Sequence, residues 1–323
     1  MSTYLPWIFD DEPEAAPLTD LSLWRQAQAD HAAALADAAL ALGQLDATLA
    51  ALPGDQRAGA ARRLALLETE EVLWLQGTPL PREEVGRDLM EARKDSDPGA
   101  LLFARWAVRR LEGESKLSDL RDFLGLQRRA GPASGMRLAG ADFDGCAADF
   151  AGAVLMARDL HPIQRAPYLE LCWRLAGVSP DALAAEPFVW SARDTASICA
   201  ALTFAPRGRH LRRLSVGGGS ADDRAARQIA AVAQGARDAR LVLSRIAAWE
   251  VEARDKVASI KGRNPQKVIA ALVAHPFLSA PMAEAETGIS RMTAERLLSR
   301  FQAMGIAREI TGAKRFRFWT AAI

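Results

Sequence analysis

The chain has 323 residues, of which 50% are hydrophobic and 25% charged, a balance typical of a soluble globular protein of about two domains. No stretch approaches the roughly 18 uninterrupted apolar residues of a membrane-spanning helix, so we expect no membrane partner. Three cysteines and four histidines are scattered along the sequence and form neither a disulfide framework nor a local metal motif. The first residues lack the layout of a secretion signal, and we therefore expect a cytoplasmic protein without cofactor or metal.

The charge is distributed unevenly along the chain, although the total is only +1. From Lys256 to the end there are eleven Lys or Arg and four Asp or Glu residues, a net charge of +7. Residues 1–255 hold 30 basic and 36 acidic residues, a net charge of −6. A basic end on a nearly neutral protein favours contact with a polyanion, and a well-solvated tail is the alternative.

The first 216 residues read as an acidic arm followed by helices. Residues 1–20 contain five acidic residues, three prolines and no basic residue, and we expect a flexible arm there. Residues 21–216 are rich in alanine and leucine at helical spacing and predict an all-α domain. The expected helices cover residues 21–52, 56–76, 82–92, 98–112, 118–130, 143–158, 161–176, 180–185 and 189–204.

A glycine run at 217–219 precedes a long connecting helix, expected over residues 221–262. Apolar residues recur along it at alternating spacings of three and four, a pattern typical of a coiled-coil seam. The same pattern would arise if this helix packed on the chain's own bundle, so both arrangements stay open. A seam would make the protein a homodimer. The stripe comprises Ile229, Val232, Ala236, Ala239, Leu243, Ile246, Glu250, Ala253, Val257 and Ile260.

Residues 263–323 carry the most informative pattern in the chain. Pro265–Ala274 is an amphipathic helix, and Ser279–Thr287 is a short second helix that ends at Gly288. Ser290 is an N-cap, and a third helix runs on through Met304. Because glycine lets two short helices meet at a steep angle, this layout predicts a helix-turn-helix whose third helix enters the DNA major groove.

Two short strands and a basic turn follow the third helix. Residues 306–311 and 316–319 are the expected strands, and Gly312–Arg315 is the turn between them. A small β-hairpin after a helix-turn-helix makes a winged helix, so the predicted fold class is mainly α with a C-terminal winged helix-turn-helix. The alternative use of such a domain is protein contact.

Candidate DNA-binding residues follow from which side chains face outward in this layout. Arginine binds guanine edges bidentately, hydroxyl groups bind bases or phosphates, and basic wing residues contact phosphates or the minor groove. The candidates are Ser290, Arg291, Thr293, Arg296, Ser299 and Arg300 on the third helix and Lys314, Arg315 and Arg317 in the wing.

The segment SAPMAEAETGISRMTAERLLSRFQAMGIAREITGAKRFRFW resembles the winged helix that closes many Fic-domain proteins. The whole chain resembles a family of alphaproteobacterial proteins that join an all-helical domain to this helix-turn-helix. In that family the N-terminal domain echoes the Fic bundle, and the stretches ARRLALLETEEVLWLQGTPLPREEV and LHPIQRAPYLELCWRLAG are similar to it.

An active Fic loop has the pattern His-Pro-Phe-x-Asp/Glu-Gly-Asn-Gly-Arg, and this chain has His161-Pro162-Ile163-Gln164-Arg165-Ala166-Pro167-Tyr168. In the family the histidine is a base, the carboxylate holds a metal, and the glycines and arginine bind phosphates. Here the histidine and proline are kept, whereas the acidic ligand and the glycines are absent. The resemblance therefore implies a degenerate loop, and we assign no catalytic residue.

Together these features predict a sequence-specific protein that binds double-stranded DNA, most simply a transcriptional regulator. It would be cytoplasmic, nucleoid-associated when bound to DNA, and a homodimer, with the helical domain serving dimerisation or sensing. A divergent Fic-like nucleotidyl transferase is one alternative, and an adaptor that docks through its winged helix is another. The sequence identifies neither the operator nor a small-molecule effector.

Overall fold

The computed structural model of the protein describes residues 18–90, 96–126, 137–214, 218–312 and 317–323. Nearly all of the expected acidic arm, part of the expected loop at 131–140, and the wing residues Lys314 and Arg315 lie outside the described residues.

In the described residues before the glycine run, every regular element is a helix, and the predicted fold class, mainly α with a small C-terminal sheet, is confirmed. Its aromatic and aliphatic side chains form one core, which includes Trp24, Trp106 and Trp173. The helices are α3 (Leu21–Asp30), α4 (Ala32–Ala50), α5 (Gly54–Leu75), α6 (Arg82–Leu89), α7 (Pro98–Leu111), α8 (Leu120–Leu124), α9 (Gly140–Met156), α10 (Pro162–Leu175), α11 (Glu186–Thr195) and α12 (Gly208–Leu214), with 3-10 turns at Asp181–Leu183 and Ala196–Ile198.

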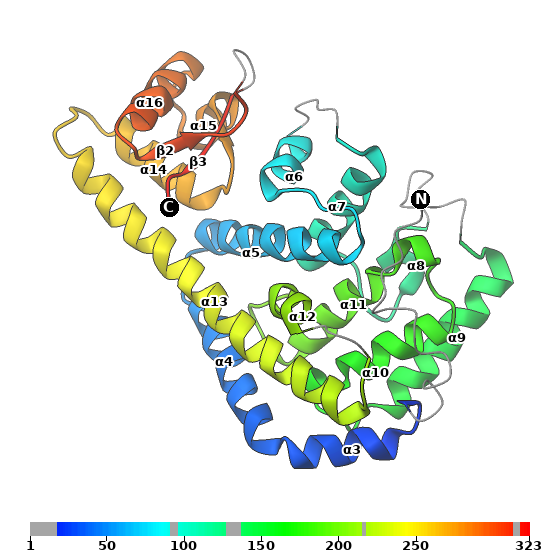
Figure 1. The fold of residues 1–323 in the computed structure, drawn as a ribbon. Coiled ribbons are helices and arrows are strands. Elements are labelled where there is room, and N and C mark those ends of the chain that lie inside the picture. The colour runs from blue at the N-terminus through cyan, green and yellow to red at the C-terminus, as the bar shows by residue number, and fades with distance from the viewer. Residues whose placement is uncertain (1–17, 91–95, 127–136, 215–217, 313–316) are drawn as a thin grey trace.

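The single helix expected over residues 21–52 is two helices, so that prediction was wrong. The chain leaves helical geometry at His31, and the His31 Nε2 atom lies 2.8 Å from Oδ1 of Asp222. Both α3 and α4 pack against the same long helix, and the chain changes direction between them (Figure 1). Neither proline nor glycine occurs at this corner, so the sequence carries no local signal for it.

The helix expected over residues 189–204 also ends early. Helix α11 stops at Thr195, and one 3-10 turn follows. The Asp46 carboxylate accepts hydrogen bonds from the amides of Ala200, Ala201 and Leu202 at 3.1, 2.7 and 2.7 Å. A side chain on α4 therefore satisfies amides that a continuing helix would have used, and the backbone turns away.

Helix α13 (Ala221–Lys256) is the long connecting helix, and it runs from the part of the helical domain near α3 and α10 to the C-terminal domain (Figure 1). Ser220 and Asp223 form a capping box at its start. The apolar stripe faces the protein's own interior: Val232 and Ala236 are fully buried, and α4, α3 and α10 pack against this helix. The proposed coiled-coil seam was therefore wrong, because the stripe has no surface left for a second copy.

One helix in the described part of the chain, α4, is long and apolar enough to cross a membrane by length and composition. Core helices meet the same criterion, and Leu42, Leu45 and Leu49 of α4 are buried in the core. The expected absence of a membrane partner stays a prediction.

The C-terminal domain has the predicted three helices and a small sheet, which places the helix-turn-helix where the sequence predicts it. The sheet is antiparallel, and β3 lies between β1 and β2. Strand β1 was not expected, because two residues are too short to show alternation. The elements are α14 (Asn264–Ala274), β1 (Leu278–Ser279), α15 (Ala280–Thr287), α16 (Arg291–Ala303), β2 (Ala307–Glu309) and β3 (Phe318–Ala321).

The last turns of α13 belong to the core of this C-terminal domain. Ile246, Trp249 and Val257 share one hydrophobic cluster with α14, α16 and the sheet. The Trp249 indole donates a hydrogen bond of 2.9 Å to the carbonyl oxygen of Ile306. Because one uninterrupted helix supplies side chains to both cores, the two domains are joined by more than a linker.

A second connection runs from α5 to the end of α14. The buried Arg63 guanidinium donates to the carbonyl oxygens of Leu272, Val273 and His275. Nearby, a Cβ atom added to Gly59 would lie 2.0 Å from the Ala274 carbonyl oxygen, so only glycine allows this approach. Helix α5 therefore holds the C-terminal domain in one orientation.

Candidate nucleic-acid interface

Helix α16 has one buried face and one exposed face. Ala294, Leu298 and Phe301 are fully buried against α14, α15 and the sheet. Arg291, Arg296 and Arg300 are exposed on the other side. This two-sided arrangement is what a recognition helix needs, because the hydrophobic face fixes the helix while the basic face can enter a groove.

The start of α16 is held by its cap and by the preceding helix. The Ser290 side chain accepts from the amide of Thr293 and donates to its hydroxyl oxygen, at 3.4 and 3.0 Å. The Glu284 carboxylate accepts a hydrogen bond of 3.0 Å from the Arg291 amide. Gly288 supplies the left-handed turn between the helices, with φ at 68°. Ser290 and Thr293, both candidate DNA contacts, thus also fix the geometry of the helix end.

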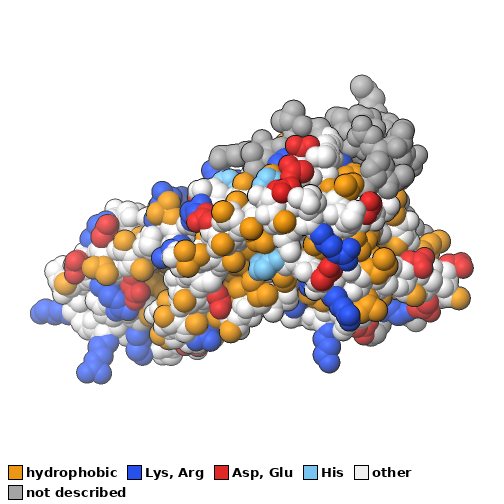
Figure 2. Space-filling view, turned by 90° about the horizontal axis from the view of Figure 1, so that it is seen from below, with side chains coloured by type: hydrophobic (Ala, Val, Ile, Leu, Met, Phe, Trp, Pro, Cys, Tyr) orange, Lys and Arg blue, Asp and Glu red, His pale blue; other side chains and the backbone are white. Residues whose placement is uncertain are grey.

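The three exposed arginines differ from most others in the protein by their lack of acidic partners. Arg291, Arg296 and Arg300 form no ion pair with any residue that the structure describes. Arg308, on the neighbouring strand, is instead held by Glu83 of α6 at 3.0 Å. Figure 2 keeps the end that carries this domain at the left, and several Lys and Arg side chains project from it. Three exposed arginines against one exposed acid, Glu295, on this helix face favour a polyanionic partner.

The structure places the remaining candidates in two groups. Arg317 donates to the Ser299 hydroxyl at 3.3 Å and to the Gln302 amide oxygen at 2.9 Å, and its guanidinium stacks over Trp319. Arg317 and Ser299 therefore brace the wing against α16, and any DNA contact would use the donors that remain. Lys314 and Arg315 lie outside the described residues. The DNA roles of all nine candidates stay predictions.

Sequence reasoning missed Met292. Its side chain is 84% exposed at the start of α16, on the face that carries the arginines. A methionine in a helix reads as a core residue, but the buried positions Ala294, Leu297 and Leu298 fix the phase and turn residue 292 outward. An exposed apolar side chain on a basic face can contact the methyl group of thymine.

In the loop that resembles the Fic motif, His161 and Arg165 both make contacts that stabilise the helical domain. His161 is the N-cap of α10: its Nδ1 accepts a hydrogen bond of 3.2 Å from the Ile163 amide, and its own amide donates to Gln28 at 2.7 Å. Burial, and secondarily the positive charge of Arg165, lowers the pKa of His161. Arg165, at the position where active loops carry the metal-binding acid, is paired with Asp194 at 2.7 Å. No group of three or more His, Cys, Asp or Glu residues in the described regions could hold a metal ion.

Two arginines of a second basic run, at 207–213, also have local partners. Arg207 is buried and donates to Glu170 and Gln228 at 2.6 Å each. Arg212 lies 3.2 Å from Glu71 and stacks on Trp74. These arginines hold the helical domain together and do not extend the basic surface of α16.

Comparison with known proteins agrees with this description of the C-terminus. Residues 266–321 match the family model described as "HTH DNA binding domain". The chain therefore carries a C-terminal helix-turn-helix DNA-binding domain, preceded by a larger helical domain. No curated protein matched.

Among solved structures, the chain is similar to a Fic family protein from Desulfovibrio desulfuricans G20. The two share 13% sequence identity and superpose with a TM-score of 0.45 over 89% of this chain and 95% of the other. A likeness at this level carries no argument about activity.

Proposed function

We propose that the protein is a sequence-specific double-stranded DNA-binding regulator of transcription, in which α16 reads bases in the major groove. The observation that carries the proposal is the exposed face of α16, where Arg291, Arg296 and Arg300 have no acidic partner among the described residues. The helical domain supplies a rigid mount, since α5 and α13 both hold the winged helix. Because Arg165 occupies the metal-acid position and His161 caps a helix, the same observations favour regulation over nucleotide transfer.

The first test measures base readout. Genome-wide mapping of bound sites in the host supplies the best duplex, and fluorescence anisotropy then compares that site with random DNA. Arg291→Ala or Arg296→Ala should cost about 1–3 kcal/mol on the best site and much less on random DNA. Arg240→Ala is the matched control, because Arg240 is exposed on α13 and donates to Gln44 of α4 in the helical domain. Equal losses on both duplexes would mean that these arginines only neutralise phosphates.

The second test concerns the wing. Replacing Lys314 and Arg315 together by alanine should weaken binding to every sequence. It should also reduce the slope of log affinity against log salt concentration by roughly one to two. The reason is that each phosphate contact releases counterions when it forms. An unchanged slope would remove the wing from the interface.

Pairing on DNA is a further part of the proposal, because one winged helix reads too few base pairs to find a single genomic site. The buried stripe of α13 cannot supply the contact, so pairing would use another surface or form only on DNA. Light scattering of the protein alone and with an inverted-repeat duplex distinguishes these cases. One protein bound per full site would exclude pairing.

A further inference from the structure

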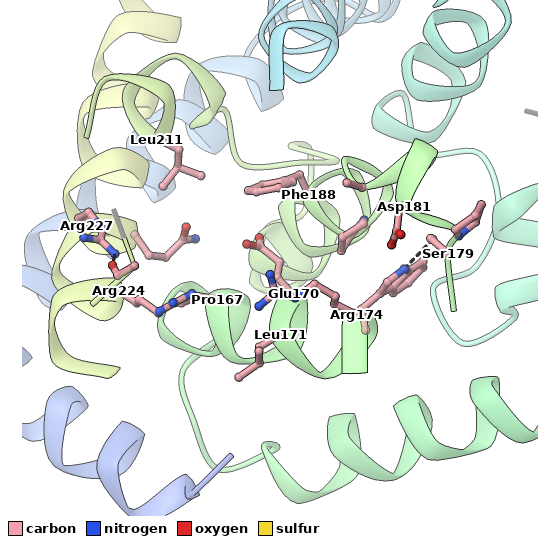
Figure 3. A pocket seen from close by; sticks show the side chains of 16 residues that line it. Pro167, Glu170, Leu171, Arg174, Ser179, Asp181, Phe188, Leu211, Arg224 and Arg227 are labelled. Atoms are coloured by element: carbon pink, nitrogen blue, oxygen red, sulfur yellow. Dashed lines mark hydrogen bonds between the residues drawn. The ribbon is translucent and has the colours of Figure 1, made fainter. Parts of the chain in front are cut away.

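The helical domain contains a cavity of about 150 Å³ between α10, α11, α12 and the first turns of α13. Pro167 and Leu171 of α10 form part of its wall, and Phe188 and Leu211 lie across from them (Figure 3). Arg224 and Arg227 of α13 stand together at one end, whereas Asp181 and Ser179 lie at the other. The cavity thus has a basic end at α13 and a middle in which Glu170 and Arg174 lie among apolar side chains.

One polar group in this wall is unsatisfied. Gln228 is only 1% exposed, and its amide oxygen accepts a hydrogen bond of 2.6 Å from Arg207. Its Nε2 atom is buried and has no acceptor among the residues that the structure describes. Leaving a buried amide donor without a partner is unfavourable, and such a group in a cavity wall indicates an acceptor that binds there.

The charges around the cavity indicate that the ligand group that accepts from Gln228 is negatively charged. Arg227, next to Gln228 in sequence, donates to the carbonyl oxygen of Gly218 at 2.6 Å and forms no ion pair with a described residue. Glu170, the acid that lies among the apolar lining residues, is already committed to Arg207 and Ser191. The end formed by α13 therefore offers a cation and a neutral donor to an anion. The Asp223 carboxylate on the same helix, which interacts electrostatically with Arg227, is hydrogen-bonded to Ser220 in the helix cap.

The size and the lining of the cavity restrict the class of ligand further. A cavity of about 150 Å³ holds a molecule the size of benzene. Prolines, leucines and Phe188 provide apolar contact for such a body, and they favour a ligand with an apolar part over a bare inorganic anion. We propose that this cavity is a binding site for a small carboxylic acid, with the carboxylate at Arg227 and Gln228 and the apolar body over Phe188.

The site goes beyond DNA binding and does not depend on it. Its basic end is the first part of α13, and the far end of the same helix supplies Trp249 to the core of the winged helix. A bound acid would add contacts to the start of the helix that connects the two domains.

The test uses the full-length protein and isothermal titration calorimetry without DNA. Benzoate, cyclohexanecarboxylate and hexanoate are the acid probes, benzamide is the neutral isostere of benzoate, and inorganic phosphate tests for charge alone. We expect at least one acid to bind with a dissociation constant of about 0.1–1 mM and benzamide to bind at least about tenfold more weakly. A melting temperature raised by about 2–4 °C at ten times the dissociation constant would accompany binding.

Two variants then locate the site. Gln228→Glu keeps the side-chain shape and the bond to Arg207, but it replaces the amide donor with a negative charge, so acid affinity should fall about tenfold or more. Arg227→Gln should have a similar effect. Arg237→Gln, on an exposed part of the same helix, is the matched control and should bind like the wild type.

Three results would overturn the proposal: no acid binds up to about 10 mM, benzamide binds as well as benzoate, or both variants bind as the wild type does. Since none of these measurements includes DNA, failure here leaves the DNA-binding proposal untouched. Likewise, failure of the DNA-binding tests would leave the ligand-binding proposal untouched.

Discussion

The contact between Arg63 and the end of α14 gives the sharpest test of how the two domains are held together. The guanidinium is buried between α5 and α14 and donates to three carbonyl oxygens, those of Leu272, Val273 and His275. These carbonyls form the C-terminal end of α14, the negative end of the helix dipole. We predict that Arg63→Met, which keeps much of the volume but removes every donor, loosens the winged helix from the helical domain.

The expected loss follows from two opposing effects. Hydrogen bonds from a charged donor contribute about 1.5–3 kcal/mol each, so three of them give roughly 4–9 kcal/mol. Burial lowers the pKa of Arg63 from 12.5 to about 10, which corresponds to a desolvation cost of about 3 kcal/mol. The guanidinium stays charged at neutral pH, and the net contribution is on the order of 1–6 kcal/mol.

Arg62→Met is the matched control, because Arg62 is the next residue on the same helix. Its side chain is 48% exposed and pairs with Glu112 at 3.0 Å, a surface contact worth less than about 1 kcal/mol. Urea unfolding gives the free energies, and hydrogen exchange followed by mass spectrometry reports on α14. Arg63→Met should unfold at lower urea concentration and show faster exchange in the amides of α14, whereas Arg62→Met should do neither.

Equal unfolding midpoints for the two variants, with unchanged exchange in α14, would refute this reasoning. Such a result would mean that α13 alone holds the winged helix and that the carbonyls at the end of α14 find other donors.

Three further predictions concern the same scaffold, and the first two use urea unfolding. Gly59→Ala should lower the free energy of unfolding by at least about 2–4 kcal/mol, because its Cβ would overlap the Ala274 carbonyl. Gly43→Ala, in open space on α4, is the control and should raise it by about 0.5–1 kcal/mol. Equal effects of the two substitutions would contradict the close approach at Gly59. Burial raises the pKa of Glu68 from 4.5 to about 7, so the folded state takes up its proton first and stability falls as pH rises from about 4.5 to about 7. Glu68→Gln should flatten that pH dependence, and an unchanged slope would assign it to other groups. Leu243→Asp should unfold or aggregate the protein by circular dichroism and light scattering, and a folded monomer would show that the stripe of α13 is dispensable for the core.

The recognition helix was predictable because its signals are local. Ser290 as N-cap, Gly288 in the turn, and apolar residues at Ala294, Leu298 and Phe301 each act within a few residues of the chain. The same periodicity gives the outward face with Arg291. Local steric and hydrogen-bonding preferences thus fix the helix, its start and its two faces before any tertiary contact forms.

The winged helix as a whole shows where local signals end. Strand β1 exists only because Leu278 and Ser279 lie beside β3, about forty residues further along the chain. Arg317 is predictable as a basic wing residue, but its bonds to Ser299 and Gln302 depend on how the hairpin folds over α16.

Only the tertiary structure decided what the remaining helices face. The stripe of α13 has the same spacing whether its partner is a second copy or α4, because an apolar period of 3.5 specifies a buried face and not its occupant. The corner at His31, the buried positions of Arg63 and Arg207, and the cavity at Gln228 likewise arise where segments distant in sequence meet. The periodicity of a sequence predicts which face of a helix is buried, and the tertiary packing determines which other segment covers that face.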